Sequence, residues 1–238
     1  GDMFLQGRMH TAPGGSWAAG IAFVGGTEIL AGTGKINILG ETTTAGGTGA
    51  DGTMEFNAWG GGTVTLTSLN TASDAILIQG KASGTATSYG MWGGNTGTRF
   101  NSAGGLIIRA DHVEAGLMVN LSVSGTVVIE PWGTSLRDGE TNTVFNFGVG
   151  GSGNFDFVSP PAAIRIGSAS NSNEVELNSS FTALGDIEVF ADDIDVTSNP
   201  TIRSSNAGGK IVLKAKDWID IRSGANTSTH ATLRTNDG

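Results

Sequence analysis

The chain of 238 residues contains no cysteine, a single tyrosine and only 15% charged residues. The absence of cysteine excludes a disulfide framework and any metal site built on thiolates. No segment approaches the roughly 18 consecutive apolar residues of a membrane-spanning helix, so we expect no membrane insertion. A net charge of −9 does not provide the basic surface that displaces counterions from phosphate, and we therefore expect no nucleic-acid partner.

Glycine, in contrast, is abundant, with 39 residues against 5 prolines. Glycine in that amount weakens helices and favours tight turns. Apolar and polar residues alternate with period 2 in many short runs bounded by Gly, Asn, Asp or Ser, and no run has helical periodicity. The pattern predicts an all-β protein, with strands expected at 35–39, 53–56, 63–67, 75–78, 117–123, 126–130, 163–166, 174–177 and 229–234.

Three segments, 104–113, 185–194 and 208–219, align almost without gaps. Ile187 corresponds to Ile211, an interval of 24 residues that is typical of solenoid repeats. The corners inside the repeat lack the Asn-Gly signal of a hairpin. We therefore predict a single-stranded parallel β-helix over 1–238, with about ten coils of roughly 20 to 25 residues. A β-sandwich is the alternative, because short strands with frequent turns also suit that fold.

Residues 133–161 interrupt the repeat. This segment holds the glycine-rich 148–153 and the pair Pro160-Pro161, which predict a loop or hairpin excursion from the rod. Insertions on one face of a repeat array often carry binding, although an inert loop is the alternative. The chain also ends on Asn-Asp-Gly, a turn that invites another strand, so we expect it to be a fragment of a longer polypeptide.

Two blocks resemble known repeats. Residues 185–196 and 208–221 resemble the repeats of filamentous-haemagglutinin-like large exoproteins, which are secreted adhesins of Gram-negative bacteria. The block 125–135, followed by 163–168, is similar to one that recurs in very large β-strand-repeat adhesins. The resemblance covers residues from about 102 to 238, and residues 1–101 share only its composition and rhythm.

The resemblance implies a right-handed β-helix, export to the bacterial cell surface or extracellular space, and adhesion or biofilm cohesion instead of catalysis. It supplies no functional residue that matches position by position. A passive structural stalk or filament subunit is the alternative, and we expect the ends of such a rod to self-associate through unpaired strand edges. A β-helical polysaccharide-degrading enzyme is a further alternative.

Aromatic residues beside glycine give the only indication of a ligand. Such rings offer uncovered faces on which sugars stack through dispersion and C–H contacts. The predicted ligand is therefore a cell-surface or matrix polysaccharide or a host glycan, unless these rings cover gaps in the core. The candidate residues are Trp59, Tyr89, Trp92 and Trp132.

No catalytic residue, metal site or cofactor is expected. The three histidines lie near no nucleophile motif, and His112 occupies a corner that we expect to be solvated. The carboxylates of Glu174, Glu176, Asp193 and Asp195 alternate with apolar residues and are expected to face solvent, with a cation site or a glycosidase pair as the alternative. Residues 46–52 match a calcium-binding nonapeptide only at its start.

Overall fold

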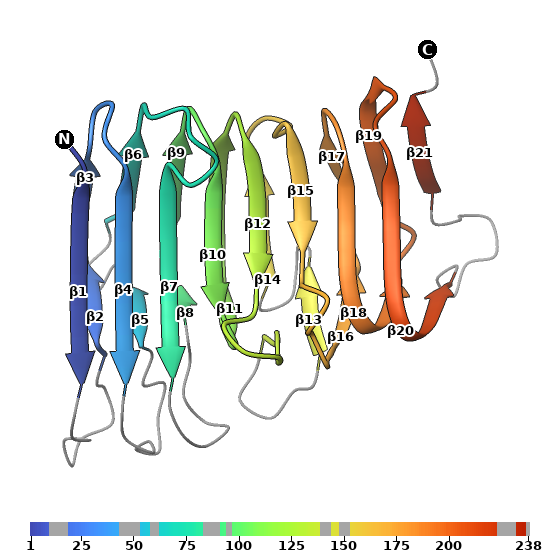
Figure 1. Ribbon diagram of the computed structural model, residues 1–238, viewed down its shortest axis with the longest axis horizontal. Helices are drawn as coiled ribbons and strands as arrows, with labels where there is room; N and C mark the ends of the chain where they lie inside the picture. Colours follow the sequence, from blue (N-terminus) through green and yellow to red (C-terminus); the bar gives the residue numbers. More distant parts are fainter. Residues whose placement is uncertain are drawn as a thin grey trace.

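The computed structural model describes residues 1–9, 19–42, 53–57, 62–82, 91–93, 97–138, 144–147, 153–222 and 232–236 (Figure 1). All regular structure in these residues is β-strand, which confirms the all-β prediction. The strands are β1 (Met3–Met9), β2 (Ile21–Val24), β3 (Glu28–Leu30), β4 (Ile36–Thr42), β5 (Met54–Asn57), β6 (Val64–Ser68), β7 (Ile76–Ala82), β8 (Met91–Gly93), β9 (Thr98–Ser102), β10 (Leu106–Ala110), β11 (Val113–Val123), β12 (Thr126–Glu130), β13 (Val144–Phe147), β14 (Gly153–Phe157), β15 (Ala163–Ile166), β16 (Glu174–Leu177), β17 (Phe181–Ala183), β18 (Ile187–Val196), β19 (Thr201–Ala207), β20 (Ile211–Ile221) and β21 (Thr232–Asn236).

The chain passes through three rows of parallel strands in the same order again and again (Figure 1). The first row runs from β1 through β4, β7, β10, β12 and β15 to the first halves of β18 and β20. The second contains β2, β5, β8, the start of β11, β13, β16 and the second halves of β18 and β20. The third contains β3, β6, β9, the end of β11 and β14, and then β17, β19 and β21.

We call one passage through the three rows a rung, and the strand register defines eight of them. The interval between register partners in the first row is as short as 21 residues, from Leu106 to Val127, and as long as 40, from Ile36 to Ile76. The prediction of about ten coils assumed that the short interval of the last repeats holds along the whole chain. The N-terminal rungs are longer, so the chain forms fewer rungs than expected. Every pairing between the described strands is parallel, unlike the antiparallel sheets of the β-sandwich alternative.

Columns of aliphatic side chains form the buried core between the rows. In the first row Ile36, Ile76 and Leu106 are register neighbours with no exposed surface, and the column continues to Ile187. Residues between them in sequence point outward, which gives β4 and β10 their alternating burial. Burying each such side chain contributes roughly 1.5–3 kcal/mol, so the alternation seen in the sequence is what fixes the register.

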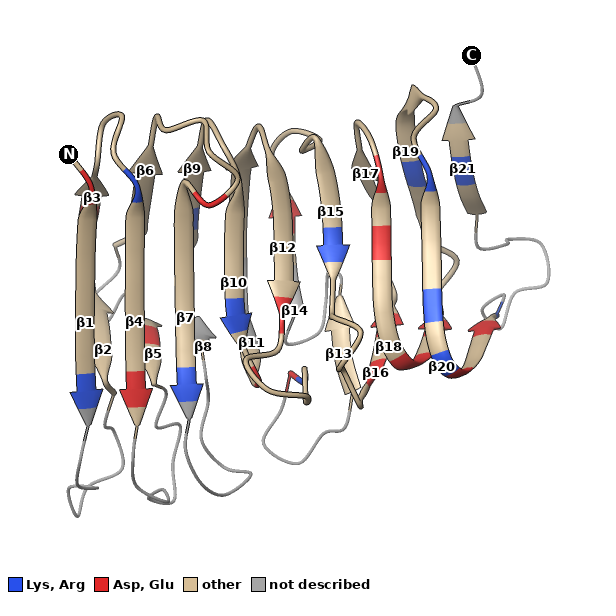
Figure 2. Cartoon of the chain, viewed as in Figure 1, with Lys and Arg blue, Asp and Glu red and all other residues tan. Residues whose placement is uncertain are grey.

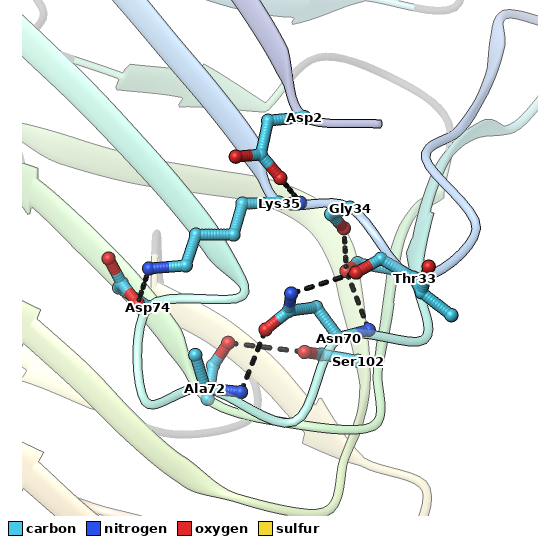
Figure 3. Close-up of polar contacts among 10 residues, drawn as sticks. Asp2, Thr33, Gly34, Lys35, Asn70, Ala72, Asp74 and Ser102 are labelled. Carbon is cyan, nitrogen blue, oxygen red and sulfur yellow. Dashed lines mark hydrogen bonds and ion pairs between the residues drawn. The ribbon is translucent and has the colours of Figure 1, made fainter.

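Polar side chains tie the turns of neighbouring rungs together (Figure 3). The backbone N–H of Lys35 donates to the carboxylate of Asp2 at 2.8 Å, and the Lys35 ammonium pairs with Asp74 at 2.6 Å. The amide of Asn70 donates to the carbonyl of Thr33 at 2.8 Å. Each contact joins one rung to the next, so the turns are stacked as regularly as the strands.

Two glycines permit a closeness of rungs that other residues prevent. A Cβ at Gly105 would overlap the carbonyl oxygen of Ser73. Gly167 has a φ of +75°, and a Cβ there would overlap the carbonyl oxygen of Phe190. These positions therefore require glycine for space, and Gly167 requires it for backbone conformation as well.

Part of the segment 133–161 takes part in the rows. Strand β13 pairs in parallel with β16, and β14 pairs in parallel with β11. Phe145 and Phe155 from these strands lie in the core, at 0% and 4% exposure. Residues 139–143 and 148–152 lie outside the described residues, so an excursion of the chain there stays a prediction.

Candidate functional site

Charged side chains on the first row form alternating sets across neighbouring rungs (Figure 2). Glu41 on β4 pairs with Arg8 on β1 and lies 3.7 Å from the ammonium of Lys81 on β7. The hydrogen bond from Arg8 is the main reason why the pKa of Glu41 lies below its ordinary value. Glu130 binds Arg109 and Arg165 in the same manner, at 2.6 and 2.8 Å. Within each set, the charge of the glutamate is balanced by basic side chains on the rungs to either side. These ion pairs help to hold the rungs in register.

Of the four aromatic residues predicted to bind sugars, one has a side chain that the structure describes. Trp59 and Tyr89 lie outside the described residues, and the side chain of Trp92 on β8 does as well. Trp132 follows β12, is 36% exposed and lies under the Lys81 ammonium, 5.5 Å from the ring centroid. This cation–π contact covers one side of the ring, and sugar binding by these residues stays a prediction.

The carboxylates of β16, β18 and β20 form an acidic ladder. Glu176, Asp195 and Asp220 are register neighbours on successive rungs, about 4.8 Å apart as parallel strands require. Arg222 bridges the ladder, with its Nε on Asp220 at 2.5 Å and a terminal nitrogen 3.5 Å from Asp195. Asp195 is only 9% exposed, so the expectation that all these carboxylates face solvent is wrong for this one.

Glu174 and Asp193 lie beside the acidic ladder on the same face. Burial raises the pKa of Glu174, and the negative charges of Asp195, Glu176 and Asp193 raise it further. Burial likewise raises the pKa of Asp193. A raised pKa suits a general acid, so a hydrolytic site would have to be sought here. Within the described residues, however, no group of three or more His, Cys, Asp or Glu side chains could hold a metal ion.

His112 is buried, at 1% exposure, and the expectation of a solvated corner is therefore wrong. The residue forms a parallel β-bridge with Arg137, and its carbonyl accepts the N–H of Met91 at 2.8 Å. Strands β11 and β13 are not paired with each other, and this bridge joins their two rungs in the second row. Burial lowers the pKa of His112 to about 3, and the positive charge of Arg137 adds to the effect. A histidine held neutral in this manner is a structural residue.

The third row is interrupted between β14 and β17. Strand β14 pairs with β11 and β17 pairs with β19, but the sheet ends on either side of this boundary. Just after the break the two rungs are joined again, because the N–H of Leu184 donates to the carbonyl of Pro161 at 2.8 Å. The break is therefore confined to the strands β14 and β17 and does not extend to the corner that follows them.

A cleft of about 260 Å³ lies at this break, and we call it the β14/β17 cleft. Its apolar wall consists of phenylalanine rings, in which Phe147 stacks on Phe155 at a centroid distance of 5.7 Å and meets Phe181 edge-on at 5.0 Å. Phe157 completes this wall, 6.1 Å from Phe147. The remaining lining residues are one proline and four polar residues: Pro160, Asp156, Ser179, Ser180 and Thr182.

The sequence contains a signal for the aromatic wall of this cleft. Phenylalanine recurs at every second position in 145–147 and again in 155–157, which marks two inward-facing strands rich in aromatic residues. Only the structure shows that these rings lie at the break in the third row. Part of the cleft does lie in 133–161, the segment in which we expected binding.

Comparison of the chain with family models, with curated proteins and with solved structures finds no match. No helix in the described residues is both long enough and apolar enough to traverse a bilayer.

Proposed function

We propose that the chain is a single-stranded right-handed parallel β-helix that forms part of an extracellular bacterial adhesin of the filamentous-haemagglutinin-like type. In this proposal it is a rod that presents its outer faces to polysaccharide or to another cell. The observation that carries the proposal is the unbroken parallel pairing of the first row through all eight rungs. Each rung contacts mainly its neighbours, the arrangement that builds extended binding surfaces in repeat proteins. The right hand of the helix is part of the proposal, and the strong preference of parallel crossover connections for that hand supports it.

The outer face of the third row supports binding to polysaccharide. Thr67, Asn101 and Ser122 are register neighbours on β6, β9 and β11, and none of them carries a charge. The amide of Asn101 donates to the Thr67 hydroxyl at 3.2 Å, which leaves further donors and acceptors for a ligand. A stripe of hydroxyl and amide groups can hydrogen-bond to successive sugars without attracting ions.

The test is binding of the purified chain to an array of microbial exopolysaccharides and host glycans. We expect binding to at least one polysaccharide, weakened at least threefold by Asn101→Leu, which removes the amide from the stripe. Trp132→Ala serves in parallel for the aromatic prediction, with Trp59→Ala and Trp92→Ala. Absence of binding to every polysaccharide would contradict the adhesin and leave the passive stalk or filament subunit.

The enzyme alternative has its own readout in the same experiment. Release of reducing ends from a polysaccharide by the wild-type chain, abolished by Glu174→Gln, would assign hydrolysis to the face beside the acidic ladder. We expect no release, because an adhesin rod holds its polysaccharide without cleaving it.

A further inference from the structure

We propose that the β14/β17 cleft binds a single uncharged pyranose ring. The inference rests on the proposed function, since it names the class of sugar residue that the rod would hold and the place where it would hold it. The cleft volume of about 260 Å³ accommodates one ring and not an extended oligosaccharide.

The two walls of the cleft match the two faces of such a ring. Phe157 is half-buried and Phe181 is 7% exposed, so the aromatic wall offers ring surface for the C–H face of a sugar. On the opposite side, Asp156 is exposed and Thr182 is half-buried, which places a carboxylate and a hydroxyl at the mouth. A carboxylate accepts two or more hydrogen bonds, as adjacent sugar hydroxyls require.

The charge of the cleft selects against other ligands of the same size. Among the described residues that line it, Asp156 alone carries a charge, so an anionic sugar or a phosphate would meet repulsion from this carboxylate. A purely apolar ligand would remove water from the hydroxyls and the carboxylate without giving them new hydrogen-bond partners, which is energetically unfavourable. A neutral ring with one apolar face and several hydroxyls satisfies both walls.

The backbone adds to the selectivity of the site. The edges of β14 and β17 that face each other are not joined in a sheet. The Ser180 hydroxyl already accepts the N–H of Thr201 at 2.8 Å, so this side chain is fixed in position before a ligand arrives. This part of the polar lining is therefore organised in the free protein, which lowers the entropic cost of binding.

The experiment is saturation-transfer NMR of the whole chain with the methyl pyranosides of glucose, galactose, mannose and N-acetylglucosamine, followed by titration of the best ligand. We expect millimolar binding of at least one of them. Asp156→Asn and Thr182→Val should each weaken it at least fivefold without reducing side-chain volume. The first removes the negative charge and one of the two oxygens that accept sugar hydroxyls, and the second removes the hydroxyl. Glu188→Gln removes a carboxylate on the first row and is the matched control, for which we expect unchanged binding.

Three results would overturn the inference. The first is that no methyl pyranoside binds, and the second is that binding survives both cleft substitutions. The third is stronger binding of methyl glucuronide or of N-acetylphenylalanine amide, which would assign the cleft to an anionic sugar or to an aromatic side chain. Polysaccharide binding by the same variants on the array separates the two proposals: if the array signal persists while the cleft fails, the adhesin stands and its site lies elsewhere.

Discussion

His112 shows how one side chain can set the acid limit of this protein. Its pKa lies near 3 in the folded chain because burial and Arg137 disfavour the imidazolium, whereas an unfolded histidine titrates near 6.5. Between these values the unfolded state binds more protons than the folded state. Stability contributed by the neutral ring is therefore complete above about pH 6.5 and is lost as the pH falls towards 3.

We expect His112→Gln to be less sensitive to acid than the wild type. Between pH 7 and pH 5 the wild-type chain should lose about 2 kcal/mol more unfolding free energy than the variant, because only the wild type takes up a proton at this position on unfolding. Urea denaturation at the two pH values measures the difference, and the carboxylates cancel because both proteins contain them. Equal losses in the two proteins would show that His112 is not the acid-sensitive group.

Strands were the most predictable elements of the chain. Runs of alternating aliphatic residues at 126–130, 163–166 and 174–177 became β12, β15 and β16 with the expected bounds, because inward columns of Ile, Val and Leu dictate both strand and register. The rung length was predictable only at 187–221, where one repeat follows another without an insertion. The β14/β17 cleft required the structure, since residues 147 and 181 meet only after the chain has passed through another rung.

Two glycines with the same left-handed backbone differ in whether a side chain at that position would collide with a neighbouring rung. Gly26 and Gly167 share a φ of +75°, but a Cβ at Gly26 would meet nothing within 4 Å while one at Gly167 would overlap the Phe190 carbonyl. Alanine substitutions at the two positions therefore separate the cost of a strained backbone from the cost of crowding the neighbouring rung.

We expect Gly26→Ala to cost about 1 kcal/mol of unfolding free energy, from the left-handed backbone alone. Gly167→Ala should cost roughly 1–3 kcal/mol more, because the methyl group forces β15 and β18 apart and strains the bond from Gly167 N–H to the Ile129 carbonyl. Chemical denaturation of the two variants gives the comparison. A similar loss in both would mean that rung spacing near Gly167 relaxes easily.

The molecule as a whole is held by three rows that are not equally continuous. The first row is paired from β1 to β20, whereas the third is divided at β14 and β17. A parallel stack in which each rung contacts its neighbours is stabilised locally, so an interruption in one row should weaken that region without dividing the molecule into separate domains.

Hydrogen exchange should record this difference across the chain. We expect the amides of β14 and β17 to exchange faster than those of β9 and β19, which lie in the same row but have a paired strand on both sides. Mass spectrometry of peptides covering the four strands is the measurement. Protection of β14 and β17 equal to that of β9 would indicate that the break in the ladder has no energetic consequence.

The unequal length of the rungs has a consequence for how such a protein can change. The connection from the first row to the second varies from no residue within β18 to 13 residues between β12 and β13, while the one from the third row back to the first is only two residues between β11 and β12 and never exceeds seven. The connection from the second row to the third varies as well, from no residue within β11 to ten residues between β20 and β21, so length variation is concentrated at the two edges that flank the second row. Evolution can add sequence at those edges, and an engineer can graft an epitope there, while the short connections between the third row and the first preserve the pitch of the scaffold.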